Sequence, residues 1–369
     1  MKKKILFVCG SVNQTSMMHQ IALHFPEYDC FFTPYYIGDF RDELAKRFFD
    51  FSILGGKYKE QTLHYLKSKA AAIDYKGAAN NYDFAVTCQD LIIQKNIKNN
   101  PVFLVQEGMT DPQRLGYFLV KNFGFPRFIA GTSATGLSDA YELFFVASQG
   151  FKEVFVKKGI SPEKIVVTGM PNFDNTKQFL NNDFPYKHFV LAATSNLREC
   201  LEYENRRKFI QKIVRIAHGR QIVFKLHPSE NVKRAVREIM RYAPNSLVFE
   251  KGNTNHMVAN CDVLVTRFSS VVFIGEALGK EIHADVPIDE IKKLAPIQNN
   301  GTSAGRIAQT IKNHLEKKST LYRLYHATHS GFETPVRNSP QRFAYERKLQ
   351  YTAEEISWNA SSRQLKGCD

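Results

Sequence analysis

The sequence has no apolar run approaching the roughly 18–20 residues that a helix needs to cross a bilayer. Near its start, Lys2-Lys3-Lys4 is followed only by the strand-length run Ile5–Val8, which is too short for the core of a signal peptide. Pairs of the C-x-x-C type are also missing, and the six cysteines are scattered, which is typical of reduced thiols and argues against a zinc site. We therefore expect a cytoplasmic protein without a bound metal.

Several nucleotide and nucleic-acid motifs are missing as well. The chain has neither a G-x-x-x-x-G-K loop nor a G-x-G-x-x-G fingerprint. It has no RNP-type motif, no zinc finger and no run of more than three residues made only of lysine and arginine, so nucleic acid is not an expected partner. The net charge of +14 instead favours a phosphorylated substrate, or an anionic membrane surface with the protein peripheral on the inner face of the cell membrane.

What the chain does contain is a regular alternation of short apolar runs and helical segments. At 369 residues, 43% of them hydrophobic, it is long enough for two domains of roughly 170–190 residues. The order strand, loop, helix begins at Lys4 and restarts at His188, which predicts an α/β protein with two doubly wound, Rossmann-like domains facing a cleft. We place the domains at residues 1–175 and 186–320. We expect the tail, residues 321–369, to be helical and to pack back toward the N-terminal domain.

The stretch Cys261–Ile282 joins a strand-like run to a helical one through the polar elbow Arg267–Ser270. Ser269 and Ser270 therefore stand where a helix begins, and the free N–H groups and dipole of a helix N-terminus favour an anion such as phosphate. Glu276 lies nearly two turns further on, where its carboxylate can take a ribose diol. The alternative is an ordinary capped crossover helix with a solvated glutamate.

Two other polar loops end predicted strands in the same half of the chain, Thr194–Arg198 and His227–Ser229. Because the carboxyl ends of parallel strands meet at one edge of a sheet, we expect both loops to converge with Arg267–Ser270. Together the three loops supply hydroxyls, two arginines and a histidine. This set of groups predicts a phosphorylated ligand.

Three residues of the N-terminal half are candidates for proton transfer. Glu107 and Asp90 each follow a predicted strand, at the edge where open α/β sheets bind ligands. His19 lies in the helix that follows the first strand. The alternatives are surface turn carboxylates for Glu107 and Asp90, and a hydrogen-bonded helix histidine for His19.

Three segments carry a resemblance to known enzymes: Pro101–Gly108 with Leu143–Asp174, the segment KLHPSEN at Lys225–Asn231, and TRFSSVVFIGEALGKE from Thr266. They resemble the end of the N-terminal domain, the strand-ending His-Pro motif and the donor-site helix of the nucleotide-sugar enzymes with the GT-B fold. The patterns are most similar to those of the non-hydrolysing UDP-N-acetylglucosamine 2-epimerases, and of the CDP-glycerol glycerophosphotransferases with their capsule-polysaccharide relatives. The resemblance covers most of residues 1–315.

The resemblance implies a nucleotide-diphosphate donor of the CDP, UDP, GDP or TDP type and no obligatory cofactor or metal. Ser269 and Ser270 would hold the diphosphate and Glu276 the ribose. His227 would donate a hydrogen bond or positive charge to the leaving group. The implied donor site consists of Thr194, Arg198, His227, Arg267, Ser269, Ser270 and Glu276.

Departures from the epimerase pattern favour group transfer. Epimerases of this group have V-E-A-G where this chain has Val105-Gln106-Glu107-Gly108, and their E-E-N-R segment has no counterpart in Gly131–Glu142. Their D-S-G-G element is Arg267-Phe268-Ser269-Ser270 here, closer to the D-Y-S-S of the glycerophosphotransferases, with arginine in place of aspartate. We expect a transferase acting on a surface-polysaccharide or glycolipid acceptor, with Glu107, or else Asp90 or His19, as its base. An epimerase-type isomerase and a non-catalytic nucleotide-sugar-binding protein are the alternatives.

Overall fold

The computed structural model describes residues 2–37, 56–199 and 202–328. The chain forms two compact units, Met1–Arg306 and Ile307–Asp369, and both sheets belong to the first. The last helix described is α11 (Ser303–Thr328), which extends into the predicted tail. From residue 329 onward the predicted tail lies outside the described residues, so its packing stays a prediction.

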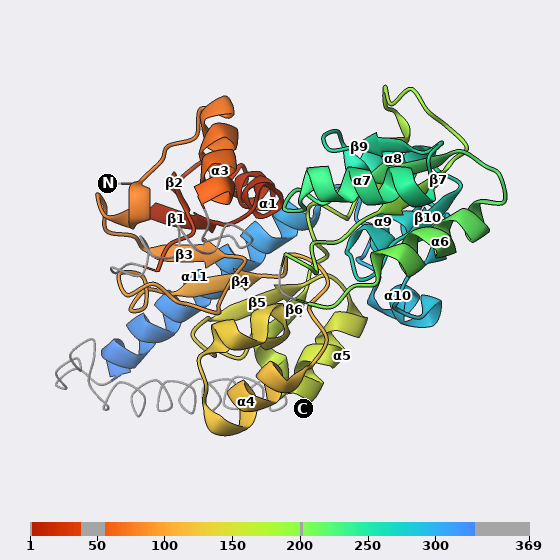
Figure 1. The fold of residues 1–369 in the computed structure, drawn as a ribbon. Helices are drawn as coiled ribbons and strands as arrows, with labels where there is room; N and C mark the ends of the chain where they lie inside the picture. The colour runs from red at the N-terminus through yellow and green to blue at the C-terminus, as the bar shows by residue number, and fades with distance from the viewer. Residues whose placement is uncertain (1, 38–55, 200–201, 329–369) are drawn as a thin grey trace, which may run out of the picture. The chain divides into compact units, whose positions relative to one another are not determined.

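The first sheet has six parallel strands in the order β2-β1-β3-β4-β5-β6 (Figure 1). Strands β3, β4 and β5 are buried along their whole length, which explains why the sequence shows continuous apolar runs and no alternation. The strands are β1 Lys4–Cys9, β2 Asp29–Pro34, β3 Phe84–Thr87, β4 Val102–Val105, β5 Leu143–Val146 and β6 Ile165–Val167. The helices are α1 Val12–Ala22, α3 Gly56–Ser68, α4 Leu115–Phe123 and α5 Gln149–Lys158, with 3₁₀ turns η1 Tyr75–Gly77, η2 Arg127–Ala134, η3 Pro162–Lys164 and η4 Thr176–Leu180.

The second sheet has five parallel strands in the order β11-β10-β7-β8-β9. Its strands are β7 Val190–Ala193, β8 Ile222–Lys225, β9 Leu247–Phe249, β10 Val263–Val265 and β11 Glu281–His283. Its helices are α6 Arg206–Ala217, α7 Val232–Tyr242, α8 Thr254–Asn260, α9 Val271–Ala277 and α10 Ile288–Leu294. The three strands that precede the predicted polar loops, β10, β7 and β8, are direct neighbours, so the loops leave the sheet along one edge.

The two sheets confirm the predicted fold class of two doubly wound parallel sheets. The chain changes sheets between Val167 and Val190, an interval that contains the predicted end of the first domain at residue 175. The domain boundaries themselves stay predictions. Different side chains build the two cores: phenylalanines in edge-to-face contact, such as Phe84 and Phe103, fill the first, and aliphatic residues such as Ile210 and Ile239 fill the second.

Candidate active site

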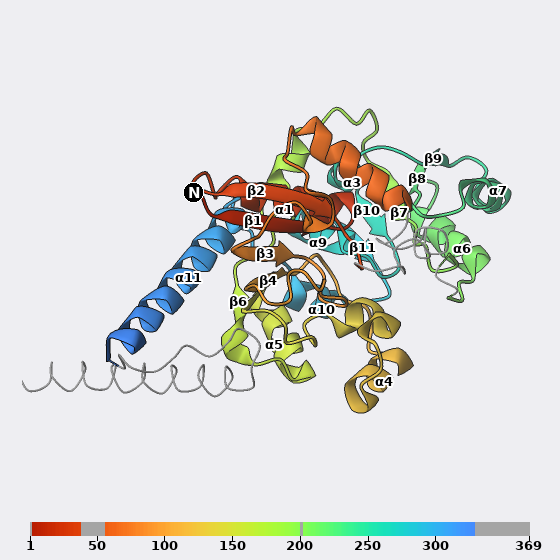
Figure 2. The same cartoon turned by 90° about the vertical axis from the view of Figure 1, so that its left-hand side faces the viewer.

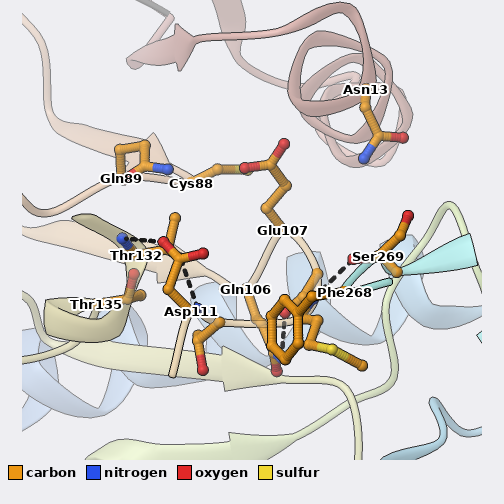
Figure 3. Close-up of a pocket in the computed structure, with 14 residues that line it drawn as sticks. Asn13, Cys88, Gln89, Gln106, Glu107, Asp111, Thr132, Thr135, Phe268 and Ser269 are labelled. Atoms are coloured by element: carbon orange, nitrogen blue, oxygen red, sulfur yellow. Dashed lines mark hydrogen bonds between the residues drawn. The ribbon is translucent and has the colours of Figure 1, made fainter. Parts of the chain in front are cut away.

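A cavity of about 240 Å³ lies where loops from the two sheets meet (Figure 3). Its walls come from the start of α1, from the loops after β3 and β4, from η2 and from the loop after β10. Apart from η2, which lies between α4 and β5, this arrangement follows from parallel topology, because each of those segments leaves a strand at its carboxyl end or begins the helix that follows. The lining residues are Asn13, Cys88, Gln89, Gln106, Glu107, Gly108, Met109, Thr110, Asp111, Thr132, Thr135, Phe268, Ser269 and Ser270.

Glu107, directly after β4, points its carboxylate toward α1 (Figure 3). Ser11 Oγ donates to its Oε1 at 3.2 Å, and Gln14 Nε2 donates to its Oε2. The same two residues form the capping box of α1, so the helix start that the sequence pattern located also fixes the carboxylate. Burial raises the pKa of Glu107 above its usual value, against the opposing effect of these hydrogen bonds. A carboxylate with a raised pKa at a cavity wall is suited to accept a proton.

The loop that carries Glu107 is held from both sides. Gln106 accepts a hydrogen bond from the backbone of Ala147 at 2.9 Å and donates one to the carbonyl of Gly108 at 2.8 Å. Gly108 approaches the second sheet so closely that a Cβ there would lie 2.4 Å from Ser270 Oγ. Met109 N then donates to that hydroxyl at 2.9 Å. Only glycine fits at position 108, because any side chain would meet Ser270.

Ser269 and Ser270 lie at the start of α9, as predicted, and both line the cavity. Ser269 Oγ accepts from the backbone N–H of Val271 at 3.4 Å, a long and local hydrogen bond. Ser270 caps no backbone group of its own helix and instead accepts the hydrogen bond from Met109. The structure therefore brings the two predicted serines and Glu107 into one cavity.

His227 and Thr194 form a second group, at the ends of the neighbouring strands β8 and β7. The backbone N–H of His227 donates to Thr194 Oγ1 at 3.1 Å, and Thr194 Oγ1 donates to Glu230. His227 Nδ1 accepts from Ser229 N at 3.2 Å, which places the ring proton on Nε2. Burial, followed by the charge of Lys225, lowers the pKa of His227 to about 4. At neutral pH His227 is therefore a hydrogen-bond donor and carries no positive charge.

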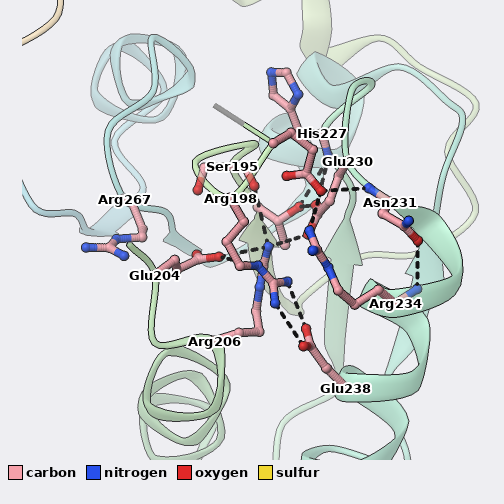
Figure 4. A network of polar contacts seen from close by, with 12 residues as sticks. Ser195, Arg198, Glu204, Arg206, His227, Glu230, Asn231, Arg234, Glu238 and Arg267 are labelled. Atoms are coloured by element: carbon pink, nitrogen blue, oxygen red, sulfur yellow. Dashed lines mark hydrogen bonds and ion pairs between the residues drawn. The ribbon is translucent and has the colours of Figure 1, made fainter. Parts of the chain in front are cut away.

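Arg198 belongs to a network of ion pairs beside the second sheet (Figure 4). Its Nη1 and Nη2 donate to the two oxygens of Glu238, both at 2.8 Å, and this bidentate contact raises the pKa of Arg198. Next to it, buried Arg206 pairs with Glu230 and, at 3.1 Å, with Glu204. The guanidinium predicted to meet phosphate is thus already occupied by a carboxylate.

The two remaining predicted donor residues lie outside the cavity lining. Arg267 Nε donates to Asp285 at 2.8 Å, and its guanidinium points away from the ion-pair network (Figure 4). Glu276 is half-buried in the last turn of α9. Neither residue lines the cavity with Ser269 and Ser270.

Asp90 and His19 make contacts that stabilise the fold, and both lie outside the cavity lining. The carboxylate of Asp90 is fully buried and accepts from the backbone N–H groups of Gly136, at 3.0 Å, and Ser138, at 3.1 Å, so it anchors the loop after η2. Burial raises the pKa of Asp90. His19 packs on the rings of Phe32 and Tyr65, and burial followed by the charge of Lys69 lowers its pKa. Neither Asp90 nor His19 lines the cavity.

Sequence reasoning missed the residues that hold the predicted ones in place. Ser11 and Gln14 had a local signal, because S-x-x-Q before an apolar stretch is a capping box. Glu230 and Arg206 had no such local signal, because their ion pair joins two separate segments of the chain. Asp111 and Thr132, which hydrogen-bond each other at the cavity wall, likewise meet only in the fold.

The described residues, 2–37, 56–199 and 202–328, contain neither a helix suited to span a membrane nor a cluster suited to bind a metal. No helix there combines the length and the apolar character needed to span a bilayer. No group of three or more His, Cys, Asp or Glu side chains there is arranged to hold a metal ion. The cysteines described, Cys9, Cys30, Cys88 and Cys261, are free thiols.

The chain has partial matches among known proteins. No protein-family model matches the chain. A processive diacylglycerol beta-glucosyltransferase of Staphylococcus aureus is 24% identical over an alignment of 213 positions that covers 48% of this chain and 53% of that protein. The chain spans about half the length of the curated relatives it matches.

Solved structures agree over a longer span. UDP-GlcNAc 2-epimerase from Neisseria meningitidis, bound to UDP-GlcNAc, has a TM-score of 0.52 at 14% identity and covers 84% of this chain and 100% of its own. A variant of the wall teichoic acid polymerase TagF has a TM-score of 0.51 at 13% identity, covering 86% and 90%. The chain therefore has the GT-B fold, as the sequence resemblance predicted.

Proposed function

We propose that the protein is a transferase that moves a group from a nucleotide-diphosphate donor to a hydroxyl of a glycolipid or surface-polysaccharide acceptor. The observation that carries the proposal is the cavity in which Glu107, with its raised pKa, faces the loop of Ser269 and Ser270 from the other sheet. The likeness to a diacylglycerol glucosyltransferase supports transfer to a lipid acceptor. The GT-B fold supports a nucleotide-linked donor.

In the proposed reaction, Glu107 accepts the proton of the acceptor hydroxyl as its oxygen attacks the transferred carbon. The bond from that carbon to the donor phosphate breaks, and the nucleoside diphosphate leaves with the electron pair. The hydroxyls of Ser269 and Ser270 and the Nε2–H of His227 are the donors we assign to the developing negative charge. A neutral His227 serves here by hydrogen bonding.

We assign the two predicted arginines, Arg198 and Arg267, a smaller part in binding the donor. Both Nη groups of Arg198 already donate to Glu238, and the Nε of Arg267 donates to Asp285. Thr194 supports the His227 turn from within the protein. Glu276 keeps its assignment to the ribose, which the titration below tests. The cavity of about 240 Å³ is smaller than the roughly 300–1,000 Å³ typical of ligand pockets, so we assign it to the reacting end of the donor.

Isothermal titration with UDP, CDP, GDP and TDP tests the donor site. We expect one of them to bind the wild-type protein, and Ser270→Ala and Glu276→Ala to lower its affinity. The titration runs without added metal, because the proposal needs no metal or further cofactor. Unchanged affinity in both variants would remove the assigned site, and binding of none of the four would remove the proposal.

A second candidate is an isomerase, which the structural likeness to UDP-GlcNAc 2-epimerase favours. Incubation with UDP-N-acetylglucosamine alone in deuterated water separates the two, because only an epimerase exchanges the C2 hydrogen without an acceptor. Exchange would overturn the transferase. Slow hydrolysis of a donor in water would exclude the third candidate, a non-catalytic nucleotide-sugar-binding protein.

We also propose where the enzyme works: in the cytoplasm, peripheral on the inner face of the cell membrane. The net charge of +14 supports attraction to anionic lipid. Nucleic acid is not among the proposed partners.

A further inference from the structure

An exposed apolar patch covers α4 and η2, which follow the cavity-lining loop after β4. Six large side chains within 15 residues of sequence are turned to solvent, against the usual preference of such residues for the interior. Leu115 is 75% exposed, Phe123 73% and Phe128 57%. In both views α4 lies at the periphery, outside the sheet (Figures 1 and 2). We call this the α4 patch; its members are Leu115, Phe118, Phe123, Phe125, Phe128 and Ile129.

The composition of α4 explains why the patch remains uncovered within its own fold. A surface helix normally buries one apolar stripe and exposes a polar face. In α4, LGYFLVKNF, the stripe containing Tyr117 and Val120 is buried, and Leu115 and Phe118 are apolar residues on the other side. The helix is therefore apolar nearly all round, a pattern that requires a second apolar partner.

The segment that carries the α4 patch is basic. From Pro112 to Ser138 the sequence contains no aspartate or glutamate, whereas Arg114, Lys121 and Arg127 add three positive charges, of which Arg114 pairs with Glu202. Lys121 is exposed at the end of α4, beside the aromatic residues. Exposed apolar side chains in a segment with basic and no acidic residues complement the acyl chains and negative headgroups of an anionic bilayer. A second copy of the chain would bring the same excess of positive charge, which disfavours contact between two such patches.

The α4 patch is joined directly to the cavity. Asp111 and Thr132, both in the cavity wall, hydrogen-bond each other across the two ends of the segment that carries the patch. Behind them, Gly116 packs against Ile129 so closely that a Cβ on Gly116 would lie 2.7 Å from the carbonyl oxygen of Ile129. These hydrogen bonds and this close packing therefore hold the segment with the exposed phenylalanines against the cavity wall.

We propose that the α4 patch inserts into the surface of an anionic lipid bilayer and that a lipid-linked acceptor reaches the cavity from that side. The second half of this statement rests on the proposed transferase function; the first half, bilayer docking, does not. Phe123 and Phe128 enter the acyl-chain boundary, and Lys121 stays at the headgroups.

Co-sedimentation of the full chain with vesicles, without donor or acceptor, tests the docking. We expect binding to equimolar phosphatidylcholine and phosphatidylglycerol, and weaker binding to phosphatidylcholine alone. The variant F123S/F128S should partition at least about tenfold less, because two large apolar side chains no longer leave water. The matched control is L23S/L180S, which removes apolar side chains that are 67% and 57% exposed elsewhere and should bind as wild type. Thermal melting confirms that each variant is folded.

A second measurement does not depend on the serine variant. Phe123→Trp in a Trp358→Phe background should show a blue-shifted emission with vesicles and quenching by brominated acyl chains. Wild-type protein that stays in the supernatant with both lipids overturns the docking, and so does F123S/F128S that binds like wild type or a Trp at 123 that is not quenched. A vesicle-free dimer that F123S/F128S converts to monomer overturns it in favour of a second copy. Nucleotide titration is a separate assay, so a failure of the docking and a failure of the proposed function are told apart.

Discussion

Both sheets collect polar side chains at the carboxyl ends of their strands, but the two edges use them differently. At the first sheet, the carboxylate of Glu107 is held by the neutral donors Ser11 and Gln14 and lies at the wall of a cavity (Figure 3). At the second sheet, arginines and glutamates hold one another, with Arg206 paired to Glu230 and Arg198 to Glu238 (Figure 4).

The difference shows that a charged side chain at a sheet edge can already be paired with another residue, and then it is not free to bind a ligand. A buried ion pair compensates the cost of removing both charges from water, and its members leave each other only at a large cost in free energy. A carboxylate held by neutral donors keeps its raised pKa and can exchange a proton. We therefore expect the first edge to carry the proton chemistry, and the second to hold the loops of Thr194 and His227 in shape.

The sharpest test of this contrast is Glu107→Gln, which keeps the shape of the side chain and removes its ability to accept a proton. We expect transfer turnover to fall by about 10²–10⁴-fold, the usual contribution of a general base. Donor affinity, measured by calorimetry, should stay near that of wild type, because Glu107 acts on the acceptor. The pH dependence should follow: since burial raises the pKa of Glu107, wild-type kcat/KM should decline toward acid at a pH above the usual 4.5 of glutamate.

The control for this variant is Glu153→Gln, which makes the same change on the surface of α5, where Glu153 pairs with Lys293. It should leave turnover unchanged. If Glu107→Gln also turned over like wild type, the base would have to be another group. The expectation that the first edge carries the proton chemistry would then be wrong.

At the second sheet the largest effect should be on stability. Arg206→Met leaves the buried carboxylate of Glu230 without its cation and Glu204 with Arg198 alone, and we expect the free energy of unfolding in urea to fall by about 3–5 kcal/mol. Glu238→Gln, at the half-buried pair with Arg198, should cost about 1 kcal/mol or less because solvent screens that pair. Equal losses would mean that the network is not organised around Arg206, and a loss of donor affinity without a loss of stability would make Arg206 a ligand residue.

The sequence was sufficient for the fold because its signals are local. Buried parallel strands appear as short apolar runs ending in polar residues, and the pattern predicted to begin at Lys4 and restart at His188 matches β1, which begins at Lys4, and β7, which begins at Val190. The three polar loops could be brought to one edge because parallel strands all end on the same side. Ser269 and Ser270 follow from the same rule.

Partners of charged side chains could not be predicted in this way. Arg198 meets Glu238 forty residues along the chain, and Ser270 meets Met109 across 161 residues. Which carboxylate an arginine meets depends on how loops pack, and no spacing in the sequence records it. Asp90 shows the same limit: its position after a strand is that of a cleft residue, but the fold uses it to anchor a loop.

The neutral state of His227 gives a smaller effect that depends on pH. Its pKa is lowered from 6.5 to about 4 in the folded protein, so between these values the unfolded chain binds a proton that the folded chain does not. The free energy of unfolding should therefore fall as the pH falls from 6.5 toward 4, by up to about 2–3 kcal/mol. His227→Gln removes the titrating group and should flatten this part of the profile. Parallel urea curves of the two proteins over that range make the comparison, and identical slopes would contradict the neutral buried histidine.

The smallest expected effect lies at the junction of the two edges, where Ser270 accepts a hydrogen bond from Met109. Ser270→Ala should lower the free energy of unfolding by about 1 kcal/mol, the net worth of one hydrogen bond. Ser269→Ala, which loses only a long local contact, should lower it by less. If both variants lose donor affinity, the two hydroxyls act on the ligand as a pair; if only stability changes, and only in Ser270→Ala, this serine joins the sheets and the diphosphate is held elsewhere. A donor bound at this junction would contact both edges at once, the edge that carries the proton-accepting Glu107 and the edge that carries the ion pairs.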